Sequence, residues 1–534
     1  MLRTFAVGTR PQLALDHDLW ASLGGAVERL HPVTKHPTPV LTPLAPWEGP
    51  GRGALWGPLH AERDADTGRV RLWYQSFDLY PGRGRDMGVR CQSVAESDDG
   101  VRFRRPALGL AAWPGASGTN AYRIGPGPGH SHGTIDGRRM DPSEDPAYRY
   151  KAVAWMGRDA EGYGRHGVAF SPDGLRWREY EGNPVSRFKS GADVVSAASL
   201  WDWFEPEPSG PTPAPKYAIF PKMQVTRGRW SRRSFTVIFA DDAAPVPFTV
   251  FDDPKLILCA DERDDDMAEE RLAGARPRLL FDEPADHRCE FYGVQVFRRG
   301  DVLLGLLWVY DAAYEMSRLG TNNQYAIVEV QLVVSRDGVH WRRVGDRRPV
   351  IPRGAPGAFD SHMIFYHSLP VAAGDEWWLY YVGFNEGHSA RTCYTEALRE
   401  RYWADVAAGR RHLPAIGLAR VRQEGFASLA ADAAPAAPVT RPLRPGGVAL
   451  ALNAAVRPGG EIRVQVQDAA GTPLDGFAAA DCTALRGDGL RLPVRWGERA
   501  VDPGWRERDV TLRFTLRDAE LFGFVFQAAP TAGA

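Results

Sequence analysis

The sequence predicts an all-β protein, a five-bladed β-propeller followed by a small C-terminal β-sandwich. Three observations predict this fold class: a turn motif that recurs along the chain, an aromatic and aliphatic strand signature before each copy, and weak helical periodicity. Five strand pairs in the same order imply five units of roughly 70–90 residues, the repeat organisation expected of propeller blades.

The recurring turn has the pattern Ser-x-Asp-Gly-x-x-aromatic. It occurs at Ser97–Phe103, Ser171–Trp177 and Ser335–Trp341. Asp-Gly is typical of hairpin turns, because Gly adopts positive φ without steric strain. We expect each copy to be a tight turn between antiparallel strands, with the aromatic residue packing back onto the sheet.

The spacing of the copies predicts two further turns. The copies begin at positions 97, 171 and 335, so the second interval is about twice the first and leaves room for a hidden copy. Phe235–Phe239 followed by Asp241 fits a decayed copy, and Ala415–Arg422 followed by Glu424 fits a fifth. A large β-sandwich with accidental Asp-Gly turns is the alternative, and the regular spacing disfavours it.

The strand signature precedes every turn. Its copies are Arg69–Gln75, Tyr148–Trp155, Lys216–Pro221, Asp301–Tyr310 and Asp375–Phe384. Tyr394–Ala408 is the one internal helix that the pattern predicts.

The C-terminal region has a different composition. Residues 427–442 are rich in Ala and Pro, which is typical of a linker. The alternating segments beyond it are Val448–Leu452, Glu461–Val466, Leu490–Trp496 and Val510–Leu516. We predict a propeller with an N-terminal extension over 1–430, a linker over 431–442 and a β-sandwich over 443–534.

Composition excludes several classes of function. The 534 residues include 65 basic and 66 acidic residues, so no overall field favours nucleic acid or an acidic membrane surface. Five cysteines without a CxxC motif indicate neither a disulfide framework nor a zinc ribbon. No apolar run reaches 18 residues, and the N-terminal stretch is not that of a signal peptide, so a cytoplasmic protein is expected.

Several sequence segments carry a family resemblance. They are LDHDLW (15–20), HPVTKHPTPVLTP (31–43), RVRLWYQ (69–75), CEFYGVQVF (289–297), SRDGVHWRRVG (335–345), GAFDSHMIF (357–365) and WWLYYVGF (377–384). With the repeated turn and the C-terminal region, they resemble five-bladed propeller proteins of the glycoside hydrolase family 32 and 43 type, in a bacterial glycosyl hydrolase-like branch. The resemblance implies a carbohydrate substrate and, through related propellers, permits a central Ca²⁺ without predicting it. No cofactor and no metal site is predicted.

The chain departs from family 32 at the motifs that carry its chemistry. The Trp-x-Asn-Asp-Pro-Asn-Gly nucleophile motif, the Arg-Asp-Pro motif and the Glu-Cys motif are all missing, and Cys289-Glu290 has the reverse order. The family's fructosidase mechanism therefore does not transfer residue by residue.

The geometry of a propeller predicts where a site would lie. The innermost strands begin near the central axis, so residues at their starts converge on one funnel. We expect the innermost strands within Leu55–Glu62, His130–Asp136, Ala192–Trp201, Cys289–Phe297 and Phe359–Leu369. Asp193, Glu290 and Asp360 stand at three of these starts, each before apolar and small residues that must be buried.

A group of carboxylates near one axis fits glycoside hydrolysis. Mutual repulsion raises one pKa, and the reaction needs one protonated acid and one ionised carboxylate. We assign Glu290 as general acid because of its longer reach and higher reference pKa. Asp193 and Asp360 are candidates for base or nucleophile and for transition-state stabilisation, in either order. The alternative is that each acid caps backbone amides at the inner rim.

Other residues near the funnel are candidates for substrate binding. They are His132, His287, His362, Tyr292 and Trp56, whose imidazoles could bind sugar hydroxyls and whose aromatic rings could stack on a sugar. A metal site built from these histidines, or simple core packing of the aromatic residues, is the alternative.

Two charged segments are expected to lie on the surface without a functional role. The acidic run Asp261–Glu270 is expected to be a solvated insertion between blades, with Ca²⁺ binding as the alternative. Arg227, Arg229 and Arg232 are expected to be exposed loop residues.

The sequence as a whole favours an enzyme that hydrolyses a glycosidic bond with paired carboxylates in the funnel, and a furanoside is one candidate substrate. The alternatives are a non-catalytic carbohydrate-binding propeller and a glycoside phosphorylase, which would need basic residues beside the acids to bind phosphate.

Overall fold

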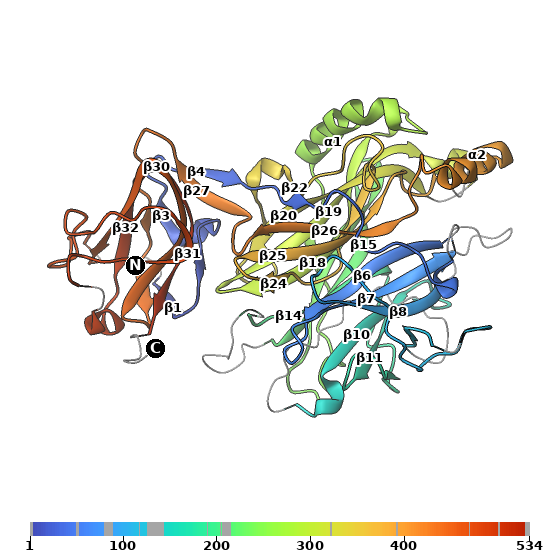
Figure 1. The fold of residues 1–534 in the computed structure, drawn as a ribbon, viewed down its shortest axis with the longest axis horizontal. Helices are drawn as coiled ribbons and strands as arrows, with labels where there is room; N and C mark the ends of the chain where they lie inside the picture. The colour runs from blue at the N-terminus through green and yellow to red at the C-terminus, as the bar shows by residue number, and fades with distance from the viewer. Residues whose placement is uncertain are drawn as a thin grey trace.

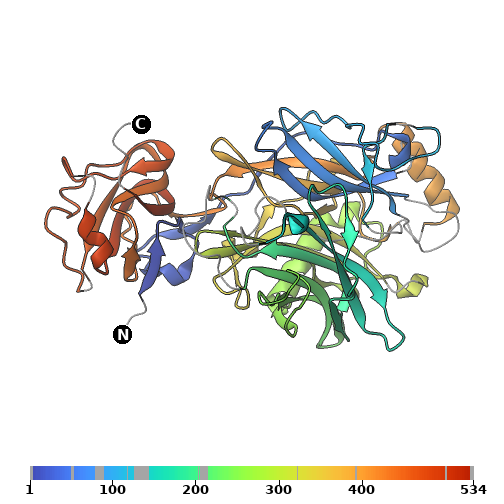
Figure 2. The same ribbon diagram turned by 90° about the horizontal axis from the view of Figure 1, so that it is seen from below.

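The computed structural model describes most of the chain, in twelve stretches. These are residues 4–49, 53–78, 89–116, 118–124, 144–189, 191–202, 204, 215–320, 323–390, 394–468, 470–499 and 502–528. Strands dominate them, which confirms the all-β prediction. The strands gather into a larger body and a smaller body that carries both ends of the chain (Figures 1 and 2).

Three four-stranded sheets begin the larger body. The first contains β6 (Gly53–Arg63), β7 (Val70–Asp78), β8 (Val89–Ser97) and β9 (Ala121–Tyr122). The second contains β10 (Tyr150–Arg158), β11 (Gly164–Ser171), β12 (Arg178–Glu179) and β13 (Ser186–Phe188). The third contains β14 (Gly191–Ser199), β15 (Tyr217–Arg227), β16 (Trp230–Phe239) and β17 (Lys255–Leu258).

The rest of the larger body is a ten-stranded sheet. Its first half contains β18 (Arg288–Arg299), β19 (Val302–Glu315), β20 (Gln324–Ser335), β21 (Arg342–Arg343) and β22 (Pro349–Ile351). Its second half contains β23 (Met363–Phe365), β24 (Val371–Ala373), β25 (Glu376–Phe384), β26 (Ala415–Arg422) and β5 (Thr34–Lys35). A single parallel pair, Val328 with Met363, joins the halves.

The three repeated turns are confirmed. β8, β11 and β20 end at the Ser of each motif, and Gly100, Gly174 and Gly338 have φ of 74°, 73° and 76°. The indole N–H groups of Trp177 and Trp341 donate to the carbonyls of Gly174 and Gly338, both at 2.9 Å. In the second and third copies the indole thus folds back over its own turn. Phe103, Trp177 and Trp341 also pack against buried clusters of the sheets, as predicted.

Two of the repeated turns also bond to a neighbouring sheet. Trp73 on β7 donates its indole N–H to the Gly174 carbonyl of the second sheet at 2.9 Å. Tyr380 on β25 donates its hydroxyl to the Gly100 carbonyl of the first sheet at 2.8 Å. The second of these bonds links the last strands of the larger body to its first.

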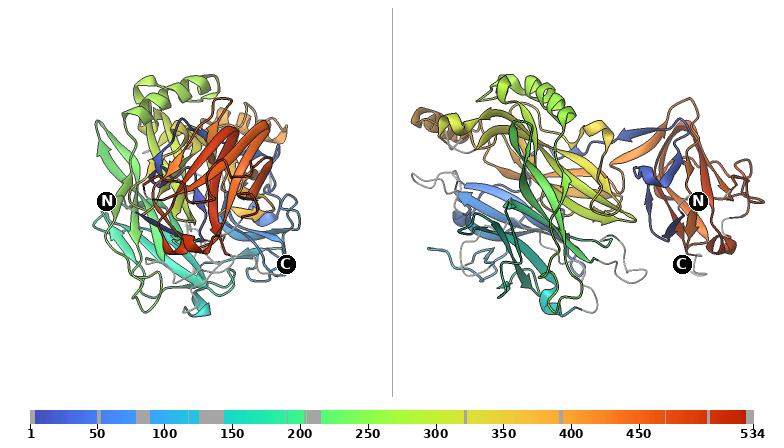
Figure 3. Two further views of the ribbon diagram at one scale, coloured as in Figure 1. Left: turned by 90° about the vertical axis from the view of Figure 1, so that its left-hand side faces the viewer. Right: turned by 180° about the vertical axis from the view of Figure 1, so that it is seen from behind.

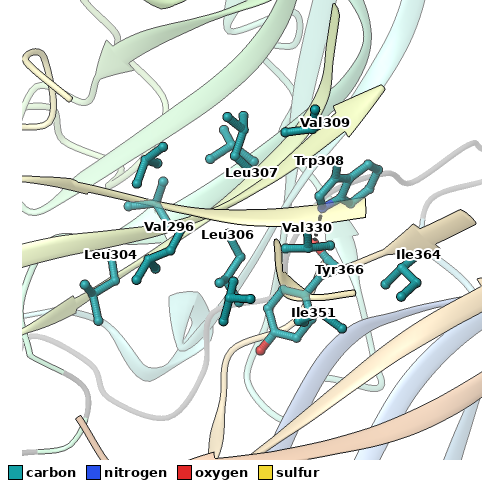
Figure 4. Close-up of a cluster of buried hydrophobic side chains, with 14 of the residues drawn as sticks. Val296, Leu304, Leu306, Leu307, Trp308, Val309, Val330, Ile351, Ile364 and Tyr366 are labelled. Atoms are coloured by element: carbon teal, nitrogen blue, oxygen red, sulfur yellow. Dashed lines mark hydrogen bonds between the residues drawn. The ribbon is translucent and has the colours of Figure 1, made fainter. Parts of the chain in front are cut away.

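Clusters of buried side chains join each sheet of the larger body to the next, and the last strands to the first sheet. One cluster joins the first two sheets, a second joins the second and third, and a third joins the third sheet to the ten-stranded sheet. A fourth joins β25 and β26 back to β6 and β7. Figure 4 shows part of the largest cluster, where Trp308 donates to the Tyr366 carbonyl at 2.8 Å.

The smaller body combines the two ends of the chain (Figure 3). Its eight-stranded sheet contains β2 (Gln12–Leu13), β3 (Trp20–Ser22), β4 (Val27–Leu30), β27 (Ala427–Ala431), β28 (Val439–Thr440), β30 (Ala449–Gln467), β31 (Asp488–Pro493) and β32 (Thr511–Gln527). β1 (Phe5–Gly8) pairs with β29 (Leu443–Pro445). The segment expected as a linker thus contains the paired strands β27 and β28, and the N-terminal strands pair with the C-terminal ones.

Two helices accompany the strands in the described ranges. α2 (Glu396–Ala407) confirms the predicted helix. α1 (Glu262–Ala275) was not expected, because its acidic residues indicated a solvated insertion. Glu262, Asp266, Glu269 and Glu270 are exposed, as expected, but three acids pair with arginines from other elements, through Arg347–Asp261, Arg343–Asp264 and Arg232–Asp265. Arg232, expected in an exposed loop, is therefore buried against this helix. In the part of the chain with assigned structure, neither helix has the length and apolar character needed to cross a bilayer.

Candidate functional site

The starts of β14 and β18 lie next to each other and bring two predicted acids into one cluster. The Ser196 hydroxyl on β14 donates to the Val294 carbonyl on β18, and the Gln295 side chain on β18 donates to the Ala197 carbonyl on β14 at 3.3 Å. Asp193 and Glu290 are each the third residue of their strand. The cluster around them is called the acid–base cluster below.

Glu290 is buried and fully paired. Its Oε2 accepts hydrogen bonds from the backbone N–H of Arg233 at 3.0 Å and from its Nη1 at 2.8 Å, while its Oε1 accepts from Arg288 Nε at 2.9 Å. Burial alone would raise the pKa of Glu290, but the two guanidinium groups outweigh it and hold that pKa below its ordinary value. Glu290 is therefore ionised at neutral pH, in contrast to the raised pKa expected from crowded acids.

Arg233 extends the cluster toward β20. Its Nη1 donates to Gln324 Oε1 at 2.5 Å and its Nη2 to Asn323 Oδ1 at 3.3 Å. The guanidinium also lies over the rings of Tyr292 and Tyr310, 5.2 and 4.7 Å from their centroids. Arg233 thus fixes Glu290 and these aromatic residues relative to one another.

Lys222 on β15 holds the second acid. Its Nζ lies 2.7 Å from Asp193 Oδ1 and 4.2 Å from the centroid of the Tyr292 ring. The lysine side chain is 4% exposed, whereas that of Asp193 is 52% exposed. Burial lowers the pKa of Lys222, and Arg233 lowers it further while Asp193 opposes the shift. A buried cation therefore orients a carboxylate that faces solvent.

Tyr292 lies at the centre of the cluster, but its ring is not an open platform. Its ring packs on Tyr310 and Phe365, with centroids 5.2 and 5.5 Å apart, and the Lys222 and Arg233 cations lie over it. Its residual exposure is 8%. We predicted that a sugar stacks on Tyr292. In this structure the ring has no open face for such stacking.

His388 holds the hydroxyl of Tyr292. Its Nδ1 lies 2.9 Å from the Ser389 hydroxyl, 3.1 Å from the Tyr310 hydroxyl and 3.2 Å from the Gln324 carbonyl. Its Nε2 lies 2.9 Å from the Tyr292 hydroxyl. Burial and the nearby Arg233 lower the pKa of His388 to about 3, so the ring is neutral at physiological pH.

Asp360 belongs to a different environment. Its Oδ2 accepts from Lys35 Nζ at 2.6 Å and from the Tyr381 hydroxyl at 2.8 Å. It is 2% exposed, and among the described residues no hydrogen bond or ion pair connects it with Asp193 or Glu290. The structure thus brings together two of the three predicted acids.

The predicted histidines are held elsewhere or lie outside the described residues. His287 sits between Glu269 and Asp282, with ring nitrogens 2.5 and 2.7 Å from their carboxylates. His362 Nε2 lies 3.1 Å from the Arg278 carbonyl, and burial lowers its pKa to about 4. His132 is outside the described residues, as is the side chain of Trp56, which is placed only by its pairing with Gln75.

Sequence reasoning missed the two cations that organise the cluster. Lys222 directly follows the apolar residues 218–221 of β15, and Arg233 lies in the polar stretch Ser231–Ser234 that precedes the apolar end of β16. A charged residue inside a strand of buried residues indicates a buried partner, and this was the available signal. The partner itself is not visible in the sequence, because Glu290 lies 57 residues from Arg233.

The acid–base cluster presents the Asp193 carboxylate to solvent and holds it by an ion pair with buried Lys222. Such a carboxylate can accept a proton from water or attack an electrophilic carbon. Within the ranges that have assigned structure, no group of three or more His, Cys, Asp or Glu side chains is placed to hold a metal ion.

Comparisons with known proteins give structural neighbours only. No protein-family model matches the chain, and no curated protein matches its sequence. The solved structures similar to it include a β-1,2-mannobiose phosphorylase from Listeria innocua with β-1,2-mannobiose, at 10% identity, covering 73% of this chain and 96% of that one, with a TM-score of 0.40. A family 32 β-fructofuranosidase from Bombyx mori is 9% identical, covers 94% of this chain and 95% of its own, and has a TM-score of 0.37. A glycosyl hydrolase from Bacteroides ovatus is 15% identical, covers 76% and 97%, and has a TM-score of 0.36. Similarities of this size do not assign an activity.

Proposed function

We propose that the chain is a glycoside hydrolase that cleaves a glycosidic bond at the acid–base cluster, with Asp193 as the carboxylate that meets the substrate. The observation that carries the proposal is the Asp193–Lys222 pair, in which a buried ammonium orients a carboxylate that is half exposed. Exposed carboxylates are common, but one held by a buried lysine at the start of a strand is typical of a functional site.

The fold that we infer for this enzyme is a five-bladed propeller. Three four-stranded sheets and two halves of a ten-stranded sheet provide five comparable units. The bond from Tyr380 to Gly100 and the shared apolar cluster connect the fifth unit to the first, as closure of a ring requires. We further infer that the smaller body is a β-sandwich domain formed mainly by residues 443–534 and completed by the N-terminal strands.

Asp193 acts in this proposal as base or nucleophile. An ionised carboxylate can deprotonate the attacking water, which inverts the anomeric centre, or attack the anomeric carbon and form a glycosyl ester that water then hydrolyses, which retains it. In both routes the departing oxygen takes its proton from solvent water, which reaches the half-exposed Asp193. The ion pair with Lys222 favours the ionised form and fixes the direction in which the carboxylate points.

Glu290 receives a positioning role instead of the general-acid role predicted from the sequence. The lowered pKa and three hydrogen bonds leave it without a proton to give. It keeps Arg233 in place over Tyr292, and Tyr292 in turn lies under Lys222.

The test is a screen of the purified protein against aryl glycosides and polysaccharides, with D193N as the active-site variant. Asp253 is exposed in a separate loop, so D253N is the matched control. Turnover that disappears in D193N and persists in D253N is expected. Turnover that survives in D193N would reject the site, and the absence of turnover across the panel would favour a non-catalytic sugar-binding protein.

Phosphorolysis is a second candidate because of one specific observation. Lys222, Arg233 and Arg288 surround the two carboxylates, and such cations are what a phosphate co-substrate requires. All three are paired with acids, which favours hydrolysis. Addition of inorganic phosphate separates the two reactions: a sugar phosphate among the products would identify a phosphorylase.

A further inference from the structure

A row of buried polar side chains without partners crosses the first sheet. β6, β7, β8 and β9 pair in register so that Gln75 stands opposite Gln92, and Gln92 opposite Tyr122. Directly opposed residues of antiparallel strands point to the same face of a sheet. Gln75, Gln92 and Tyr122 therefore form one line, called the polar row below.

The polar row is closed to solvent and most of its hydrogen-bonding capacity is unused. Gln75, Gln92 and Tyr122 are 0%, 5% and 1% exposed. Neither the Nε2 nor the Oε1 of Gln75 has a hydrogen-bond partner among the described residues, and the same holds for Gln92 Nε2 and the Tyr122 hydroxyl. Gln92 Oε1 alone is used, accepting from the backbone N–H of Ile124 at 2.9 Å.

Such a concentration of buried polar atoms requires partners from outside the described side chains. Buried polar atoms are almost always paired, because each unpaired one costs the free energy of its lost hydration. Four atoms of this kind lie along the polar row, and His60 Nδ1 on the adjacent strand is a fifth. Water or a bound ligand can supply the missing hydrogen bonds.

The surroundings of the polar row indicate what it binds. The row faces the second sheet, since Tyr122 shares an apolar cluster with Trp73 and with Tyr150 on β10. The row itself contains no charged side chain, so an ionic ligand is disfavoured. A carboxamide offers one acceptor and two donors, and adjacent sugar hydroxyls match both.

The local strand geometry is irregular at this place. On β6, residues 57–59 lie between Trp56, which pairs with Gln75, and His60, which pairs with Trp73, so three residues of β6 face one of β7. β-bulges of this kind are frequent beside binding and active sites, where they redirect side chains.

We propose that the polar row is a binding subsite for a neutral carbohydrate, whose hydroxyl groups pair with Gln75, Gln92 and Tyr122. The proposal rests on the proposed function for the chemical class of the ligand. The row lies where the first sheet packs on the second, so a ligand reaches it only when these two sheets separate locally.

The test compares stability and sugar binding in the full chain. Gln75→Met removes an unpaired amide and keeps the side-chain length, so the melting temperature should rise, by roughly 1–3 °C for a chain of this size. Gln295→Met is the matched control: Gln295 is equally buried but donates to the carbonyls of Ala197 and Val296 at 3.3 and 3.2 Å, so its loss should lower the melting temperature. Tyr122→Phe should behave like Gln75→Met.

Binding is measured by saturation-transfer NMR and titration calorimetry with D-mannose, D-galactose, L-arabinose and D-fructose, each alone at millimolar concentration. We expect at least one sugar to bind the wild-type chain, and to bind Gln75→Met about tenfold more weakly. Stabilisation by Gln75→Met with unchanged sugar affinity, or no binding to the wild type, would mean that the row holds internal water only and would overturn the proposal. A lower melting temperature of Gln75→Met would overturn it as well, because Gln75 would then be paired.

The outcomes separate this proposal from the proposed function. If D193N abolishes turnover while Gln75→Met changes neither KM nor sugar affinity, the subsite is rejected and the hydrolase stands. If sugar binding depends on Gln75 but no substrate is turned over, the hydrolase is rejected and the subsite stands.

Discussion

The ammonium of Lys222 lies 2.7 Å from a carboxylate oxygen of Asp193, and one of the two side chains is buried while the other is half exposed. The pair is thus asymmetric: the lysine is fixed by its position over Tyr292, and the aspartate takes its orientation from the lysine. This asymmetry leads to the first prediction.

Lys222→Met should separate activity from stability. Methionine preserves much of the apolar stem, and removal of a buried cation whose pKa is already lowered by burial relieves a desolvation cost, so stability should change by less than about 1 kcal/mol. Asp193 loses its orienting partner, and kcat should fall by about tenfold or more while KM changes little. Steady-state kinetics and thermal melts check both. Full activity in Lys222→Met, or rescue absent in Lys222→Arg, would speak against a positioning role.

Glu290→Gln should reduce activity by lowering the free energy of unfolding. The substitution removes the negative charge that pairs with buried Arg233 and Arg288, and an uncompensated buried charge costs about 3–5 kcal/mol. Glu161→Gln is the control, because the Glu161–Arg187 pair is exposed and is expected to contribute no more than about 1 kcal/mol. Chemical unfolding measures both. A Glu290→Gln variant as stable as the wild type but inactive would instead restore a direct chemical role for Glu290.

Low pH should destabilise the contact between the two bodies, because it protonates Glu424. Its carboxylate accepts from Arg299 at the end of β18 and from Arg491 on β31 of the smaller body, at 2.8 and 2.7 Å. Burial opposes ionisation, but Arg299 and Arg491 lower the pKa of Glu424 from 4.5 to about 2. Because the folded pKa is the lower one, the stabilisation is complete above pH 4.5 and disappears as the pH falls toward 2. It amounts to about 3 kcal/mol.

The measurement is the free energy of unfolding from about pH 6 to about pH 2 for the wild type and Glu424→Gln. The variant should be less stable at neutral pH and should lose less on acidification. Parallel pH curves for the two proteins would show that Glu424 does not carry this dependence.

Gly100→Ala should be far more disruptive than Gly68→Ala. Both glycines have positive φ, 74° and 69°, so an alanine at either position is strained by about 1–2 kcal/mol. At Gly100 the added Cβ would also lie 2.0 Å from the Trp378 ring, whereas at Gly68 it would meet nothing within 4 Å. The difference between the melting temperatures of the two variants measures how closely the first sheet packs on β25 at Gly100. Equal shifts would mean that this contact contributes little.

The sequence was sufficient for the parts of the fold that are encoded locally. The turns at Gly100, Gly174 and Gly338 follow from Asp-Gly pairs with an aromatic residue three positions later, since the signal and the structure involve the same short segment. α1 was missed because Arg343 and Arg347 pair with Asp264 and Asp261 at its start, and no local pattern connects these arginines to it.

The same distinction explains the candidate site. Asp193, Glu290 and Asp360 share one sequence pattern, an acid before a buried strand, and the pattern could not separate them. Their partners separate them: Asp360 is paired with Lys35, more than three hundred residues away, and Glu290 with Arg233. Long-range pairing thus decides which acid faces solvent and which is internal.

The pairing of β2, β3 and β4 with β32, β28 and β27 has a consequence for synthesis of the protein. The first thirty residues leave the ribosome early, but their partner strands are made only after about four hundred further residues. At roughly 5–20 residues per second this delay is on the order of tens of seconds. During that time the nascent N-terminal strands lack their partner strands, and their open edges can pair with other chains.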